Sequence, residues 1–102
     1  MLKLAPSARA EQRCNARAMG VVSREHRDMQ PDELVAYAFE DSVISAAVVN
    51  APGGAIRSRG AWYRISYHCI TSADGLEVQE FDYRLGAAVP RAQWADHYLV
   101  PE

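Results

Sequence analysis

Residues 61–71 read AWYRISYHCIT, and this stretch decides the fold. Apolar and polar side chains alternate along it, which is the period of a β-strand with one buried face. The expected core face carries Tyr63, Ile65, Tyr67 and Cys69. The opposite face carries Trp62, Arg64, Ser66 and His68. We expect that face to be largely polar and solvent-exposed, as antiparallel sheets permit.

Other strands precede and follow this one. After it, residues 72–75 have the Asp-Gly signature of a hairpin turn, and residues 76–85 return antiparallel. Before it, the pattern predicts strands over residues 34–39 and 43–49. The inward residues of the flanking strands are expected to be Val35, Tyr37, Phe39, Phe81, Tyr83 and Leu85, and the outward ones Glu80, Asp82 and Arg84.

The glycine-rich segment between these strands predicts a break in the chain. Residues 50–54 read NAPGG, and we expect a positive φ at Gly53 or Gly54. Residues 55–58 then form a short strand, or the start of a longer strand bent at Gly60.

The region before the strands predicts one helix over residues 7–22. Ser7 is a good N-cap, and Ala10, Cys14, Ala18 and Val21 recur at helical spacing on one narrow apolar face. Arg9, Arg13, Arg17 and Arg24 fall largely on the solvated side. Gly20 and the polar stretch before Pro31 are expected to end the helix.

The C-terminal region adds a short helical element. Residues 86–90 read as a connector, and Pro90 opens a helical turn that runs through Trp94 and Tyr98. We expect this tail to have a packing or capping role. The predicted fold is therefore α+β: an N-terminal helix packed on a four- to five-stranded antiparallel meander sheet, with a short C-terminal helical turn.

Cys14 and Cys69 are the chain's two cysteines, and both are expected to be buried. They are too few to identify a redox compartment by counting, and no CxxC or HxxxH spacing predicts a zinc site. The pair is either two buried thiols or one disulfide, and we favour the disulfide. Closing a loop of this length would stabilise the fold by about 4 kcal/mol in the chain-entropy model.

Length and composition narrow the class of protein. The 102 residues form one expected domain, and a net charge of −2 gives no reason to expect nucleic acid as a partner. No apolar run is long enough to span a bilayer, and the first ten residues contain no signal-peptide core. We expect a fragment of a longer exported or membrane-anchored protein, with Met1 supplied for expression. No cofactor motif or metal set is present in the sequence.

Several segments together resemble a known family. They are EQRCNARAM at residues 11–19, ELVAYAFED at 33–41, NAPGGAIRSRGAWYRISYHC at 50–69 and FDYRLGAAVPRAQWADHYL at 81–99. This pattern resembles a bacterial family known as domain of unknown function 930. Both cysteine positions coincide with that family's pattern. The resemblance implies an envelope protein with an export or anchoring region before this domain, and it implies no reaction, ligand or catalytic residue.

The best candidate site in the sequence is the segment from Arg57 to Arg64. Guanidinium groups beside aromatic rings can hold an anionic or glycan ligand by forked hydrogen bonds and stacking. The tentative binding residues are Arg57, Arg59, Trp62 and Arg64. The structural alternative is that Arg57 and Arg59 pair with Glu80 or Asp82 across the sheet while Trp62 covers its edge.

Enzymatic alternatives rest on fewer residues. His68 should point away from Cys69, so the two are poorly placed as a nucleophile pair, and Asp96 with His97 lacks a nucleophile. Glu80 and Asp82 share a strand face and suggest a cell-wall or glycan hydrolase. We expect instead a non-catalytic binding domain in the periplasm or cell envelope, whose partner is an envelope protein or an anionic or glycan ligand. A purely structural capping domain is the third hypothesis.

Overall fold

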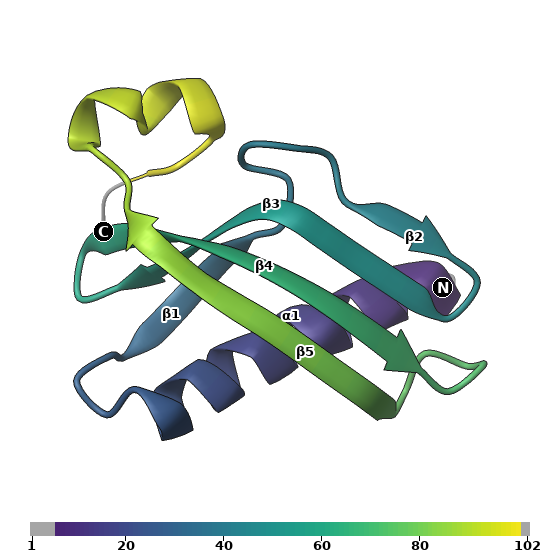
Figure 1. Ribbon diagram of the computed structural model, residues 1–102. Coiled ribbons are helices and arrows are strands. Elements are labelled where there is room, and N and C mark those ends of the chain that lie inside the picture. The colour runs from purple at the N-terminus through teal and green to yellow at the C-terminus, as the bar shows by residue number, and fades with distance from the viewer. Residues whose placement is uncertain (1–5, 101–102) are drawn as a thin grey trace, which may run out of the picture.

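The computed structural model describes residues 6–100 and shows one helix, a five-stranded antiparallel sheet and two 3-10 turns (Figure 1). The sheet order is β1-β3-β4-β5, with β2 paired to the same edge of β3 as β1. The α+β prediction is confirmed. The elements are α1 (Pro6–Glu25), β1 (Pro31–Val35), β2 (Val43–Ser45), β3 (Val48–Ser58), β4 (Ala61–Thr71), β5 (Val78–Ala88), η1 (Arg91–Gln93) and η2 (Ala95–His97).

The hairpin of β3 and β4 forms the centre of the sheet. Ser58 lies opposite Ala61, so only Arg59 and Gly60 connect the strands. Both have positive φ, 51° and 76°. This is the two-residue turn whose twist matches that of the flanking strands. The bounds predicted for β4 are confirmed, and Gly60 lies in a turn rather than a bend within one strand.

The predicted break at residues 50–54 is wrong, because β3 runs through it with a register shift between Ala51 and Gly54. The prediction of positive φ at Gly53 or Gly54 is also wrong, since Gly60 and Gly75 are the glycines with positive φ in the described range. Close packing explains Gly53 instead. A Cβ there would lie 2.6 Å from the backbone N of Glu40.

The strand predicted over residues 34–39 lies earlier in the chain, at Pro31–Val35, and the buried residues have the opposite phase. β1 ends at Val35, and the buried residues are Leu34, Ala36 and Ala38. The small alanines pack closely against the sheet, while Phe39 and the half-exposed Tyr37 lie beside rings of the C-terminal tail. The strand predicted over 43–49 is two strands, because the chain reverses at Ala46, whose φ is 53°.

The inner face of the sheet is covered by α1, which lies across it in Figure 1. The buried helix residues follow a four-residue spacing: Ala10, Cys14, Ala18 and Val22. Val22 therefore replaces the predicted Val21, and the helix ends at Glu25 rather than at residue 22. No helix in the described part of the chain is long and apolar enough to cross a membrane. The structure does not describe the Ser7 side chain or residues 1–5. The predicted capping by Ser7 and the predictions for residues 1–5 therefore lie outside the described part of the chain.

A disulfide joins this helix to the sheet. Cys14 and Cys69 are bonded, with their Cα atoms 6.1 Å apart. The alternative of two buried thiols is therefore wrong. Because Ala10 and Ala18 flank Cys14 on the same helix face, the helix backbone can approach β4 closely enough for the bond.

The outer face is covered at one end by the C-terminal tail. Trp62, Trp94 and Leu99 form a second buried cluster there, together with Ala38, Ala55 and Val89. The indole nitrogen of Trp62 donates a hydrogen bond to the Val100 carbonyl (2.9 Å), and that of Trp94 donates to the Val89 carbonyl (3.0 Å). The packing role predicted for the tail is confirmed. The strand before it, predicted over 76–85, extends to Ala88 and shortens the predicted connector.

Candidate functional site: a groove between the helix and the edge strand

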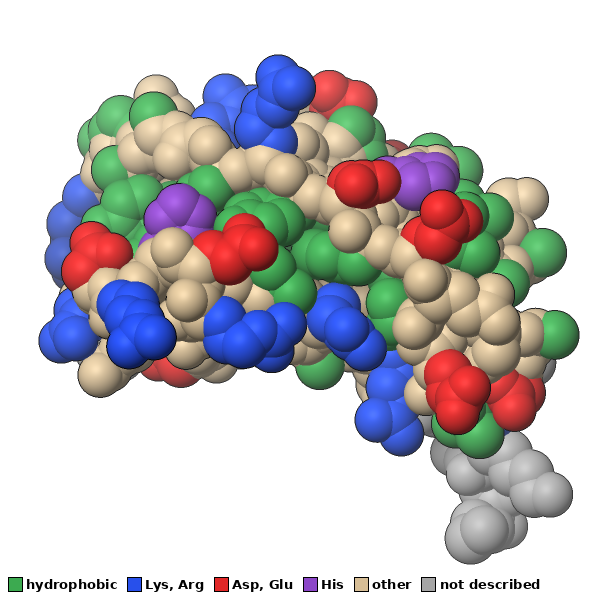
Figure 2. Space-filling view, turned by 60° about the horizontal axis from the view of Figure 1, so that its bottom comes forward, with side chains coloured by type: hydrophobic (Ala, Val, Ile, Leu, Met, Phe, Trp, Pro, Cys, Tyr) green, Lys and Arg blue, Asp and Glu red, His purple; other side chains and the backbone are tan. Residues whose placement is uncertain are grey.

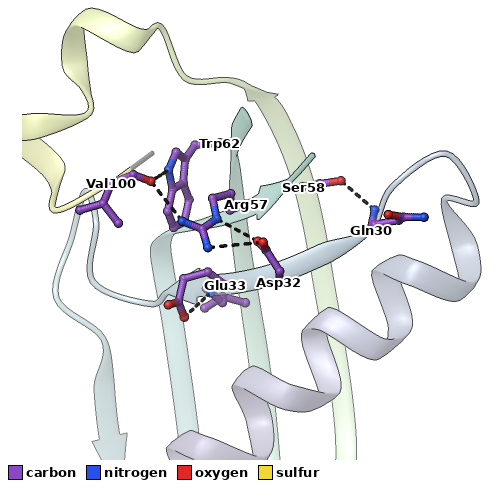
Figure 3. Close-up of polar contacts among 8 residues, drawn as sticks. Gln30, Asp32, Glu33, Arg57, Ser58, Trp62 and Val100 are labelled. Atoms are coloured by element: carbon purple, nitrogen blue, oxygen red, sulfur yellow. Dashed lines mark hydrogen bonds and ion pairs between the residues drawn. The ribbon is translucent and has the colours of Figure 1, made fainter. Parts of the chain in front are cut away.

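Two of the predicted binding residues, Trp62 and Arg57, form contacts with other parts of the protein. Trp62 is on the predicted outer face but is fully buried under the tail, so its expected exposure is wrong. Arg57 forms an ion pair with Asp32, with Nε 2.9 Å from Oδ1, and also donates to the Val100 carbonyl (Figure 3). The Arg57 guanidinium lies 5.6 Å from the Trp62 ring centroid. Arg57 and Trp62 thus hold the end of the tail against the sheet.

The other two predicted residues lie apart from this pair. Arg59, in the β3–β4 turn, donates from Nε to the Asp28 carbonyl (2.9 Å). Arg64 is exposed and lies over the Phe39 ring, 4.1 Å from its centroid. The alternative pairing of Arg57 and Arg59 with Glu80 or Asp82 is wrong for Arg57, whose carboxylate partner is Asp32. A ligand contact by Arg59 or Arg64 stays a prediction.

The residues considered for catalysis have structural neighbours. His68 Nδ1 is hydrogen-bonded to the Asn50 side chain, and His97 Nδ1 to the Ala38 carbonyl (2.8 Å). Glu80 and Asp82 are exposed on β5, opposite Ile70 and His68. Both carboxylates line open hollows at the surface and are exposed to solvent, so neither is desolvated beside a second polar group. This geometry does not favour the hydrolase hypothesis.

A groove runs between α1 and β5, and we call it the α1–β5 groove. Its larger hollow has a volume of about 560 Å³, with Gly20 and three arginines on the helix side. An adjoining hollow of about 470 Å³ extends it along β5 toward Tyr83. The two share Arg17, Arg24 and Val78, so they form one continuous depression. In Figure 2, basic side chains follow one another along this side of the molecule, below a band of hydrophobic side chains.

The three arginines of the groove are Arg13, Arg17 and Arg24. Their spacings of four and seven residues place them on one face of the helix, with Gly20 between them. All three are exposed, and none makes a hydrogen bond or ion pair with any residue in the range 6–100. Like charges four residues apart on a helix repel one another. The helix wall of the groove therefore presents three guanidinium groups without an ion pair in the described range, and four carboxylates also line the two hollows: Glu25, Glu77, Glu80 and Asp82.

Sequence reasoning placed these arginines on the solvated side and assigned them no role. The available signal was their spacing around Gly20, which leaves a gap in the row of long side chains. Helix periodicity alone could not show that β5 lies opposite that gap. The position of β5 depends on the sheet order, which places a strand from the other half of the chain beside α1.

Acidic side chains line both hollows of the groove, with Glu77 in the larger one and the others in the adjoining one. Glu25, at the end of α1, accepts a hydrogen bond from the Tyr83 hydroxyl. Burial, together with this hydrogen bond and the charge of Glu25, raises the pKa of Tyr83 to about 12. Glu80 and Asp82 alternate with Phe81 and Tyr83, so they border the groove from the outer face of the sheet.

Comparison with known proteins identifies the family of this chain. A family model described as Domain of Unknown Function (DUF930) matches residues 1–99, which is nearly the whole chain. Neither a search of curated proteins nor a search of solved structures found a match. The match agrees with the resemblance of residues 11–19, 33–41, 50–69 and 81–99, and the chain belongs to the DUF930 family.

Proposed function

We propose that this chain is a non-catalytic binding domain of a bacterial cell-envelope protein and that it captures a negatively charged partner in the α1–β5 groove. The observation that carries this proposal is the set of Arg13, Arg17 and Arg24, which face one groove without a partner in the described part of the chain. Guanidinium groups form paired hydrogen bonds with carboxylates and phosphates. Three in a row also raise the local concentration of anions.

The extracytoplasmic location is supported by the Cys14–Cys69 disulfide. Disulfides persist mainly in oxidising compartments and are rare in the cytosol. The bond also has a consequence for binding. Because it ties the middle of α1 to β4, the helix wall of the groove is held at a set distance from the sheet. A preformed groove loses less conformational entropy when a partner binds.

Binding of simple polyanions tests the proposal. A fluorescein-labelled penta-glutamate peptide and inorganic tripolyphosphate are suitable probes, with anisotropy and competition measured at low salt. We expect the triple variant R13Q/R17Q/R24Q to bind the peptide at least tenfold more weakly, which corresponds to about 1.4 kcal/mol. Affinity of the unchanged chain should also fall as salt screens the charges.

The matched control is R27Q/R84Q/R91Q, which removes the same charge from exposed sites outside the two hollows. This control variant should retain affinity for the peptide within about twofold, because salt screens the charges of residues that lie outside the binding surface. Near-UV circular dichroism of both variants checks that the fold is intact. Equal losses in the two triple variants, or no loss in the groove variant, would exclude the groove as the binding surface.

A further inference from the structure

We infer that two copies of this chain pair through β5, in antiparallel orientation about a two-fold axis at Tyr83, so that their sheets join into one. The inference does not rest on the proposed function, because it uses the edge and the side chains of β5 and none of the arginines of α1. It starts from the place of β5 at one edge of the sheet (Figure 1). β5 pairs with β4 on one side, and no strand of the described chain lies on the other.

The free edge of β5 is regular at its centre. Its pairing with β4 has register shifts near both ends, but from Glu80 to Leu85 the register is unbroken, and no proline lies in this stretch. Along a free edge, every second residue directs its N–H and C=O groups outward, without a ladder partner. The opposite edge of the sheet is divided between the short strands β1 and β2, so it offers no comparable length. The edge of β5 is therefore the place where a further strand can add to this sheet.

The inner side of β5 is incompletely covered by its own chain. Phe81, Tyr83 and Leu85 pack against the core cluster, but each stays partly exposed. In the proposed pair, Phe81 of each copy lies opposite Leu85 of the other, and the two Tyr83 side chains lie opposite each other. These side chains cover one another at the join, and removal of their apolar surface from water favours association.

The outer side of β5 carries charges of both signs, and they complement one another in this register. Glu80, Asp82 and Arg84 are exposed there. About an axis at Tyr83, Asp82 of each copy lies opposite Arg84 of the other, so the pair gains two contacts between opposite charges. Glu80 lies opposite Gly86, which has no side chain. An interface about a two-fold axis must be complementary to itself, and this stretch of β5 meets that condition.

The neighbouring registers do not have this complementarity. When both inner faces lie on the same side of the joined sheet, the axis must pass through a residue, because side chains alternate along a strand. An axis at Asp82 would place two aspartates opposite each other, and an axis at Arg84 would place two arginines opposite each other. Like charges in these positions repel. The charge order of β5 thus selects both the register and the occupant, since a second copy carries the complementary order by necessity.

Sedimentation equilibrium of the oxidised chain, over micromolar to millimolar concentrations, measures this association. We expect a monomer–dimer equilibrium for the parent. D82R and R84D should each raise the dimer dissociation constant by about tenfold or more, because each replaces two opposite-charge contacts by two like-charge contacts. D41R is the matched control, since it makes the same change of charge as D82R at an exposed residue outside β5, and it should stay within about twofold of the parent. Near-UV circular dichroism checks that each variant is folded.

A mixture of D82R and R84D tests the register directly. In the mixed pair, one edge carries two arginines and the other carries two aspartates, so both contacts again join opposite charges. We expect the mixture to associate within about threefold of the parent, although neither variant does so alone. In the parent, hydrogen exchange should slow at alternate β5 amides between Glu80 and Leu85 as the concentration rises, because only every second amide points to the second copy.

The outcomes separate this inference from the proposed function. A parent chain that stays monomeric at millimolar concentration would overturn the pairing, and its binding of polyanions would still support the groove. A dimer that the mixture fails to restore, or that leaves the β5 amides unprotected, would place the contact elsewhere and also overturn the inference. The groove variant R13Q/R17Q/R24Q leaves β5 unchanged and should still pair. Peptide binding is compared below the concentration at which the parent pairs, so that pairing does not enter that comparison.

Discussion

The two faces of this sheet are covered in different ways. On the inner face, one 20-residue helix packs through small residues and is joined to β4 by the Cys14–Cys69 disulfide. On the outer face, the tail with its two short 3-10 turns packs Trp94 and Leu99 around Trp62 of β4, and its described residues form no disulfide with the sheet. Small residues allow the close approach that a disulfide needs, whereas a short tail must bury large rings to be held at all. The inner face is therefore the rigid one, and it carries one wall of the proposed binding groove.

The largest expected effect comes from removal of the covalent bond on the inner face. The double variant C14A/C69A should lose about 4 kcal/mol of unfolding free energy, because the unfolded chain is no longer restrained by a long closed loop. Urea denaturation followed by circular dichroism measures this loss. The reduced parent chain is the control and should show a similar loss. A change below about 1 kcal/mol would mean that packing alone holds the helix on the sheet.

On the outer face, W94A should cost about 3 kcal/mol, since it empties a large part of the cluster that covers Trp62. Q93A is the matched control, because Gln93 is the exposed neighbour in the same turn and should change stability by less than about 0.5 kcal/mol. The same urea titration serves for both variants. If the two cost the same, the tail contributes little to the stability of the outer face.

The smallest expected effect is a pH dependence of the unfolding free energy, caused by Tyr83 at the boundary of the inner face. The pKa of Tyr83 is raised to about 12, first by burial and then by Glu25, so the folded state favours the protonated hydroxyl. The stability this provides is fully present below the ordinary tyrosine pKa of about 10 and is lost as pH rises toward 12. The absorbance titrations at 295 nm of the parent chain and of Y83F should differ by one tyrosine that ionises near pH 12. Ionisation of that tyrosine near pH 10 would contradict the assigned contact with Glu25.

The parts of the fold that follow local patterns were predictable. The bounds predicted from alternation over residues 61–71 match those of β4, and the Asp-Gly turn precedes β5. The four-residue spacing of Ala10, Cys14 and Ala18 predicts the buried helix face. These predictions succeeded because strand and helix periods depend on neighbours a few residues away. The burial of both cysteines was predictable in the same way, whereas the disulfide was only the favoured one of two alternatives until the structure showed it.

Predictions failed where distant segments decide the conformation. Gly53 and Gly54 look like a turn, but Gly53 is needed because the backbone of Glu40 passes close to it. Phe39 and Tyr37 look like core residues, but the tail supplies rings for them on the other side. Trp62 looks exposed because its strand neighbours are polar. Its burial depends on residues more than 30 positions later in the chain.

The amino-acid sequence by itself determined the order of helix and strands, the two faces of β4 and the pair of cysteines, because each depends on local periodicity and side-chain chemistry. The tertiary structure alone decided that the tail buries Trp62 and that Arg13, Arg17 and Arg24 face an unpaired sheet edge. Burial and groove formation depend on which distant surfaces meet. Which surfaces come into contact depends on how the whole chain buries its apolar area, and not on the residues on either side of a given position.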